Sequence, residues 1–132
     1  MMHSLRIKTT AREELQNITN AVSQAIKDSG VQEGVALVYS PHTTSGITIQ
    51  EAADPDVARD ILSTLARLVP HRGDYRHVEG NADAHVKSAL VGSSQTVVIE
   101  AGQLKLGRWQ GIFFCEFDGP RQRTVWLNIL GQ

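Results

Sequence analysis

Residues 96–130 contain three runs rich in β-branched and aromatic side chains, and this segment leaves little choice of fold class. The runs are Thr96–Ile99, Ile112–Phe117 and Thr124–Leu130. Glycines and the sequence Asp118–Pro120 separate them, and residues of these types favour turns. Three β-rich runs separated by turn-favouring residues predict a sheet that is largely antiparallel.

The first fifty residues contribute further strands. Leu5–Thr9 alternates apolar and polar side chains, which is typical of a half-buried strand. Val35–Tyr39 and Thr43–Gln50 are rich in β-branched and apolar residues. We expect a bend between these two strands at Pro41-His42, because a proline disfavours helical backbone in the residue before it.

Three segments carry helical signals. Residues 10–30 begin with a threonine and glutamate spaced as a capping box, continue with apolar residues at helical intervals and end at a glycine. Residues 54–70 begin with Asp-Pro-Asp and end at a proline, and residues 81–92 begin with an asparagine and end at a glycine. Residues 71–80 lack an apolar period and are expected to form a loop. The sequence therefore predicts an α+β fold in which one domain, residues 1–132, packs about three helices against the sheet.

The bulk properties restrict the class of protein. With 13 basic and 14 acidic residues the chain has a net charge of -1, so we expect neither nucleic acid nor a membrane as partner. The amino terminus lacks the apolar core of a signal peptide, and no apolar run is long enough to span a membrane. The single cysteine, Cys115, cannot form an internal disulfide, which fits a cytoplasmic protein.

Three histidines are the candidate ligands of a metal ion. His42 follows a predicted strand, His77 lies in the predicted loop and His85 lies in the first turn of the third helix. Imidazole is the commonest ligand of transition metals, and catalytic zinc sites use three protein ligands while leaving one position open. Hydroxyl groups beside His42 and a helix start beside His85 would suit phosphate or carboxylate oxygens. The alternative is that the hydroxyls only favour strand formation and that Asn81 only caps a helix.

Three blocks of the sequence resemble the signatures of the YjbQ family, also called UPF0047. The blocks are Pro41–Glu51 with Asp54–Val57; Tyr75–His77, Glu79–Asn81, Ala84–Lys87 and Leu90–Ser94; and Leu106–Ile112, Cys115–Phe117 and Asp118–Arg121. They come in the family's order and with the family's separations, and the similarity covers nearly the whole chain. The sequence departs mildly from the common pattern at 50–53 and 81–83.

The resemblance implies an α+β domain that forms a homotrimer and holds a divalent metal ion on His42, His77 and His85. Zinc is the leading candidate for that ion, with magnesium or another divalent metal as alternatives. The family has been assigned a secondary thiamine-phosphate synthase activity, in which a pyrimidine pyrophosphate is joined to a thiazole phosphate with loss of pyrophosphate. If the trimer forms, we expect its contacts to come from Phe113, Phe117, Val125, Trp126, Leu127 and Ile129.

The mechanistic hypothesis is that the metal polarises a phosphate oxygen of a small phosphorylated or anionic substrate. The oxyanion partners predicted beside it are Thr44, Ser45, Lys87, Ser93 and Ser94, with Arg121 and Arg123 as phosphate clamps or, alternatively, solvated arginines. Glu79 or Glu116 would act as a general base or orient a ligating histidine, unless it is solvated or paired in a strand. Trp109 would line a pocket for a flat ring, or lie in the core or a subunit interface.

Two other classes of function stay open. In the first, the same metal activates water and the protein is a hydrolase of a small phosphorylated substrate. In the second, the protein is a non-catalytic trimer that binds a small anion.

Overall fold

Strand β8 (Gln122–Gly131) is the longest strand in the computed structural model, which describes residues 1–132. It pairs with β1 (Met2–Lys8) on one side and with β3 (Gly34–Tyr39) on the other. β5 (Ser94–Glu100) follows β3, and the short β6 (Gln103–Leu104) closes this five-stranded sheet in the order β1-β8-β3-β5-β6. Each neighbouring pair is antiparallel, as the sequence predicted.

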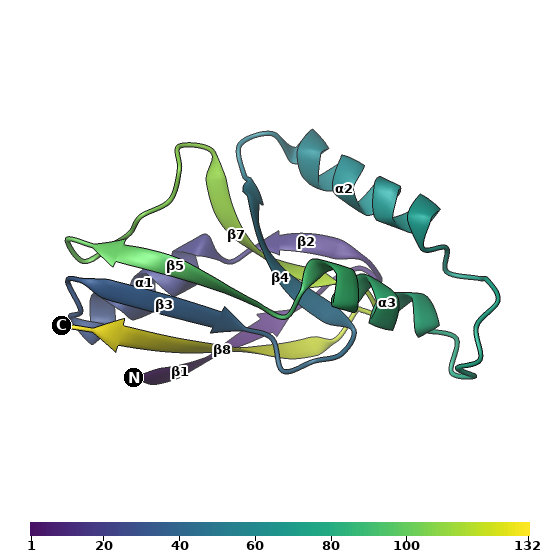
Figure 1. Ribbon diagram of the computed structural model, residues 1–132, viewed down its shortest axis with the longest axis horizontal. Helices are drawn as coiled ribbons and strands as arrows, with labels where there is room; N and C mark the ends of the chain where they lie inside the picture. Colours follow the sequence, from purple (N-terminus) through teal and green to yellow (C-terminus); the bar gives the residue numbers. More distant parts are fainter.

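A second sheet lies beside the first (Figure 1). It contains β2 (Glu14–Asn17), β7 (Gln110–Glu116) and β4 (Ser45–Glu51) in the order β2-β7-β4, and both pairs are antiparallel. The α+β class and the antiparallel pairing are therefore confirmed, but the strands form two sheets where the sequence analysis counted one. The expected bend at Pro41-His42 carries the chain from β3 in the larger sheet to β4 in the smaller one.

The main hydrophobic core lies between the two sheets and helix α1 (Thr19–Ser29). Alternate residues of β8 point inward, and this period of two explains why one face of the strand is apolar and buried. The fully buried core side chains include Val22 and Ile26 from α1, Val38, Ile99, Val125 and Leu127 from the larger sheet, and Ile47, Ile112 and Phe114 from the smaller one. Burying a side chain of this kind contributes about 1.5–3 kcal/mol.

Helix α1 begins later than the sequence predicted. The capping box expected at Thr10 does not form, because residues 14–17 pair with β7 as strand β2. The Thr10 hydroxyl instead donates to the Glu14 carboxylate at 2.9 Å. The end of the helix is as predicted: Gly30 adopts a left-handed conformation with φ of 74° and its N–H donates to the carbonyl of Lys27. Pairing between distant strands has overridden a local helix signal.

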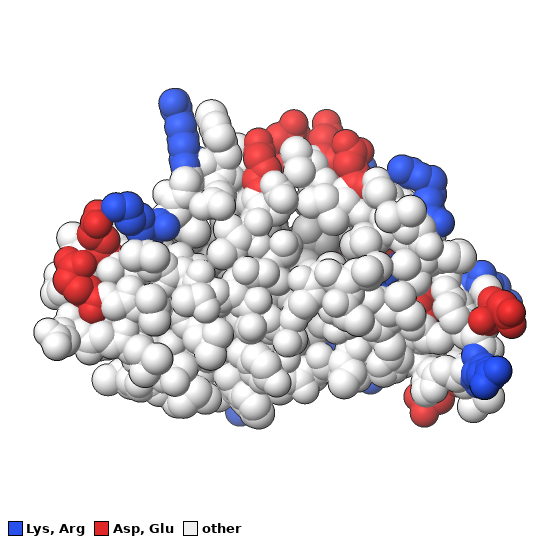
Figure 2. Space-filling model, in the orientation of Figure 1, with Lys and Arg blue, Asp and Glu red and all other residues white.

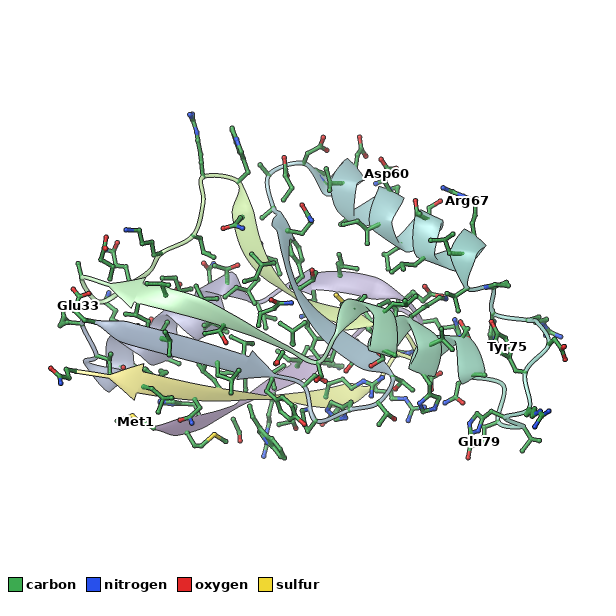
Figure 3. The ribbon with its side chains drawn as sticks, viewed as in Figure 1. Met1, Glu33, Asp60, Arg67, Tyr75 and Glu79 are labelled. Atoms are coloured by element: carbon green, nitrogen blue, oxygen red, sulfur yellow. The ribbon has the colours of Figure 1, made fainter.

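Helix α2 (Pro55–Leu68) begins where the sequence predicted, since the Asp54 side chain accepts a hydrogen bond from the N–H of Asp56 at 2.9 Å. The helix lies on the outside of the molecule, and none of its residues is fully buried (Figure 1). Asp60 and Arg67 point away from the body of the protein (Figure 3). None of the helices is both long and apolar enough to cross a membrane.

Helix α3 (Ala82–Val91) packs on β4 and carries His85. Asn81 precedes the helix as predicted, but its side chain makes no capping hydrogen bond; its amide N–H donates to the Asp118 carboxylate at 2.8 Å. Gly92 ends the helix, and its carbonyl accepts a hydrogen bond from the N–H of Ile47 at 3.0 Å. This contact fixes the end of α3 to the beginning of β4.

The outer face of the larger sheet is apolar and open. Trp126 and Tyr39 stack on it with ring centroids 5.8 Å apart, and Val98 and Leu130 are about half exposed. Figure 2 shows that charged side chains gather along α2 and at the two ends, leaving the middle of the visible face uncharged. Of the residues expected at a trimer contact, only Trp126 lies on this face. The others are buried in the interior of the protein: Phe113, Phe117, Val125, Leu127 and Ile129.

Gly46 marks the closest approach of β4 to the end of α3. A Cβ atom at this position would lie 2.7 Å from the carbonyl oxygen of Gly92 and 2.9 Å from the side chain of Val91. We predict that Gly46→Ala lowers the free energy of unfolding by about 1–3 kcal/mol because β4 and α3 must move apart. Chemical denaturation measures this loss. Gly107→Ala is the matched control, since only the flexible side chain of Gln110 approaches that position, and an equal loss in both variants would contradict the prediction.

Candidate functional site

His42 and His85 line one open pocket, which we call the histidine pocket. Its walls are the turn after β3 and one side of α3, and its volume is about 440 Å³. The residues that line it are Tyr39, Ser40, Pro41, His42, Thr43, His85, Ser88, Ala89, Gly92 and Ser93. Two histidines that are far apart in the sequence therefore face the same space.

Buried serines hold the two walls of the pocket together. The hydroxyls of Ser40 and Ser45 form a hydrogen bond of 2.7 Å, and Ser88 on α3 donates to the carbonyl of Ser45 at 2.6 Å. The Ser40 hydroxyl also accepts from the N–H of His42 at 3.3 Å. Because these groups are satisfied inside the protein, the turn and the helix keep a fixed relation.

His77 lies in the loop between α2 and α3, where it lines a separate pocket together with His71 and Tyr75. Its ring contacts that of His85 edge to face, with centroids 5.3 Å apart and planes at 81°. Two imidazoles bound to one tetrahedral zinc ion would have centroids about 5 Å apart, given a zinc–nitrogen bond of about 2 Å. The centroids of His77 and His85 have this spacing. Glu79 lies 3.8 Å from Nε2 of His77 and extends from the loop into solvent (Figure 3).

His42 does not fit the same ion in this arrangement. Its Nε2 atom accepts a hydrogen bond from the backbone N–H of Thr124 at 2.9 Å. The single lone pair of a neutral imidazole is therefore already engaged. Burial, and next the positive charge of Arg123, lower the pKa of His42 and favour the neutral ring. Accordingly, no group of three or more His, Cys, Asp or Glu side chains is arranged to hold a metal ion.

Glu116 and Arg123 face each other in the interior instead of the pocket. The Arg123 guanidinium donates to both Glu116 oxygens, one bond being 2.8 Å from Nε, and also to the Thr44 hydroxyl at 2.9 Å. Glu116 accepts further hydrogen bonds from the Thr9 hydroxyl and the N–H of Asp118. Burial alone would raise the pKa of Glu116, but these hydrogen bonds outweigh it and lower the pKa. Glu116 is thus paired in a strand, which was the alternative left open for it, whereas Arg123 is buried and paired and is neither a phosphate clamp in the pocket nor a solvated arginine.

Lys87 is also paired in the interior. Its side chain is fully buried, and Nζ donates to Asp83 at 2.9 Å and to Glu13 at 3.0 Å. Arg12 contacts the same Asp83 carboxylate at 3.2 Å. Burial would raise the pKa of Asp83, but hydrogen bonds from Lys87 and Arg12 lower it. This network ties α3 to the segment before β2. Lys87 was predicted to face the pocket, but it points into the interior instead.

The remaining predicted residues are divided between the pocket and other places. Ser93 lines the histidine pocket, whereas Ser94 begins β5 outside its lining. Arg121 bonds to the Asp118 carboxylate at 2.9 Å and is exposed. Trp109 is exposed in a loop under the guanidinium of Arg108, and it neither lines the pocket nor lies in the core.

Thr43 and Ser88 line the pocket but were not among the predicted site residues. Thr43 lies inside the same sequence block as His42 and is directly adjacent to it. That adjacency was the available signal for Thr43. Ser88 carried no such signal, since only the turn of α3 brings it against Ser45.

Comparisons with known proteins agree on one family. The family model described as UPF0047 protein YjbQ-like matches residues 3–132. The UPF0047 protein of Methanocaldococcus jannaschii is 53% identical over 99% of this chain and 95% of its own length. The UPF0047 protein YugU of Bacillus subtilis is 52% identical over 99% of this chain and 100% of its own.

Solved structures have the same fold. A protein of Clostridium acetobutylicum, described as an uncharacterised conserved protein of the YjbQ/UPF0047 family, superposes with a TM-score of 0.96 at 55% identity, covering 97% of this chain and 99% of its own. A protein of unknown function from Sulfolobus solfataricus, described as YbjQ-like, has a TM-score of 0.96 at 29% identity, covering 100% of this chain and 97% of its own. The fold is thus retained at low sequence identity.

The buried pair of Glu116 and Arg123 yields a prediction about acid stability. Because the pKa of Glu116 lies below its ordinary 4.5, the pair stabilises the protein fully above that pH and less as the pH falls through the lowered pKa. Glu116→Gln should lower the free energy of unfolding at neutral pH by about 3–5 kcal/mol, since Arg123 stays buried without a counter-charge. The difference from wild type should shrink on acidification, measured by urea denaturation across pH.

Glu100→Gln is the control for this experiment, because its pair with Lys105 is exposed and should contribute less than about 1 kcal/mol. A loss for Glu116→Gln that is the same at every pH would contradict the prediction.

Proposed function

The chain belongs to the UPF0047 YjbQ-like family, and from that membership we propose that it is a metal-dependent enzyme acting on a small phosphorylated substrate in the histidine pocket. The observation that carries the proposal is that His85 lies beside both of the other candidate histidines, although the three come from separate parts of the chain. His42 and His85 share a pocket, and the ring of His77 contacts that of His85. The reaction to be tested first is thiamine-phosphate synthesis, which the family resemblance implies.

His77 and His85 supply the metal ligands in this proposal. Their ring spacing suits a divalent ion with the remaining positions left for water or substrate oxygens. When bound, the ion supplies a positive charge that polarises a phosphate oxygen. Glu79, close to His77, is suited to orient that imidazole, as carboxylates near metal-binding histidines commonly do.

The distribution of charge supports the need for a cation. No lysine or arginine lines the histidine pocket, and the nearby candidates have partners within the chain. Lys87 is neutralised by Asp83 and Glu13, and Arg123 by Glu116. A phosphate or pyrophosphate group in the pocket would therefore meet neutral donors only, unless a metal ion accompanied it. Zinc is the first ion to test, with magnesium next.

We also propose that three copies assemble through the open face of the larger sheet. This face presents Tyr39 and Trp126 as a stacked pair, with Val98 and Leu130 nearby, and few charges interrupt it (Figure 2). Exposed apolar patches of this kind mark contacts between proteins. The homotrimer that the family resemblance implies would bury them.

The proposed reaction yields a prediction about metal binding and activity together. We expect His85→Ala to lose bound divalent metal and the formation of thiamine phosphate from the pyrimidine pyrophosphate and thiazole phosphate. Elemental analysis of protein purified without chelator and product detection by chromatography measure the two losses. His3→Ala is the control, since that imidazole lies on β1 outside the pocket.

Metal retained in full by His85→Ala would overturn the assignment of the ligands. If the wild type binds metal but instead hydrolyses members of a phosphoester panel, the protein is the hydrolase considered above. A tight ligand recovered unchanged would make it a non-catalytic binding protein.

The proposed trimer yields a prediction about assembly. Trp126→Glu should convert the trimer into a monomer at micromolar concentration, because it places a charge in the middle of the apolar face. Light scattering coupled to gel filtration measures the mass. Trp109→Glu changes an exposed tryptophan away from this sheet and should leave the trimer intact. A wild-type monomer would contradict the proposed assembly.

A further inference from the structure

The end of strand β3 leaves one backbone donor of β8 without a strand partner. The last paired residues of the two strands are Tyr39 and Trp126. Beyond that point β8 continues beside β1 alone, and the N–H of Thr124 donates to Nε2 of His42 at 2.9 Å. The imidazole thus takes the place that a carbonyl of β3 would have held. Thr124 is partly buried, and this bond satisfies a backbone N–H that would otherwise lose its partner within the protein.

This bond determines which nitrogen of His42 carries the proton. A backbone N–H can only donate, so Nε2 must offer its lone pair, and in the neutral ring the hydrogen then sits on Nδ1. Rotating the ring by half a turn would place a C–H group against the N–H of Thr124, which removes the bond. Thr124 is held in register with Arg6 of β1, so it cannot easily turn away.

The histidine pocket that His42 lines offers hydrogen-bond donors but no free lysine or arginine. Ser40 and Ser88 are engaged with Ser45, whereas the hydroxyls of Thr43 and Ser93 make no hydrogen bond within the chain and are exposed. Nδ1 of His42 likewise has no partner in the protein. N–H and O–H groups that converge on one open space suit an acceptor with several oxygens.

We propose that His42 binds an oxygen of the phosphate or pyrophosphate group of the substrate through its Nδ1–H, and that it is not a metal ligand. The proposal rests on the proposed function only in placing the substrate in the histidine pocket. It divides the three histidines into two roles. His77 and His85 bind the ion, and His42 is a neutral donor whose proton position is set by Thr124.

Nitrogen NMR tests the position of the proton directly. In protein labelled with ¹⁵N-histidine, long-range proton–nitrogen spectra distinguish the two neutral forms of each ring. We expect His42 to carry its hydrogen on Nδ1, both without metal and after addition of one equivalent of zinc. A hydrogen on Nε2, or a zinc-dependent shift that shows nitrogen–metal bonding at His42, would overturn the inference. The signal is assigned by its loss in His42→Gln.

A pair of substitutions tests the contact with the anion. His42→Asn keeps a donor near the position of Nδ1, whereas His42→Gln keeps an acceptor near Nε2 for Thr124 and loses that donor. We expect the Kd of inorganic pyrophosphate, measured by calorimetry with zinc present, to rise about tenfold more in His42→Gln than in His42→Asn. Both variants should bind as much zinc as the wild type, and His3→Ala should match the wild type in both measurements.

Loss of zinc from both His42 variants, equal weakening of pyrophosphate binding, or no binding by the wild type would each overturn the proposal. None of these measurements depends on turnover. A protein that makes no thiamine phosphate but shows the Nδ1–H form and the expected order of affinities would refute the proposed reaction and leave the role of His42 standing.

Discussion

The buried ion pair of Glu116 and Arg123 connects the parts of the structure on which the site depends. Glu116 ends β7 in the smaller sheet, and Arg123 lies near the start of β8 in the larger one. The same guanidinium binds the hydroxyl of Thr44, which holds the turn between β3 and β4. A buried charge without its partner is strongly unfavourable, so neither sheet can shift without breaking this pair. The next residue of β8, Thr124, is thereby fixed where its N–H meets His42.

The charged residues therefore stabilise the framework, and the neutral ones face the pocket. Glu116, Arg123, Asp83 and Lys87 satisfy one another in the interior, where low polarity strengthens paired charges and penalises single ones. Imidazoles and hydroxyls remain on the open side. An anionic ligand there needs donors that are already oriented and a cation that the chain itself does not supply. The proposed phosphate site rests on this division, because a bound metal ion would supply the positive charge that the lysines and arginines do not.

Sequence reasoning predicted local features well and failed where distant segments decide. Asp54 caps α2 and Gly30 ends α1 as expected, because these signals depend on a few neighbouring residues. The start of α1 was wrong because residues 14–17 pair with β7, about a hundred positions away. Lys87 and Arg123 have the right chemistry for phosphate, yet their partners Glu13 and Glu116 could not be identified from spacing.

By itself, the sequence determined the type of most elements, the α+β class, the family and the three histidines as the residues of interest, since periodicity, capping residues and motifs are all read along the chain. The tertiary structure alone decided that the strands form two sheets, that Trp126 is exposed while its apolar neighbours are buried, and that Nε2 of His42 is occupied by Thr124. The physical reason is that the free energy of a polar side chain depends on the partner it meets, and that partner is usually remote in sequence.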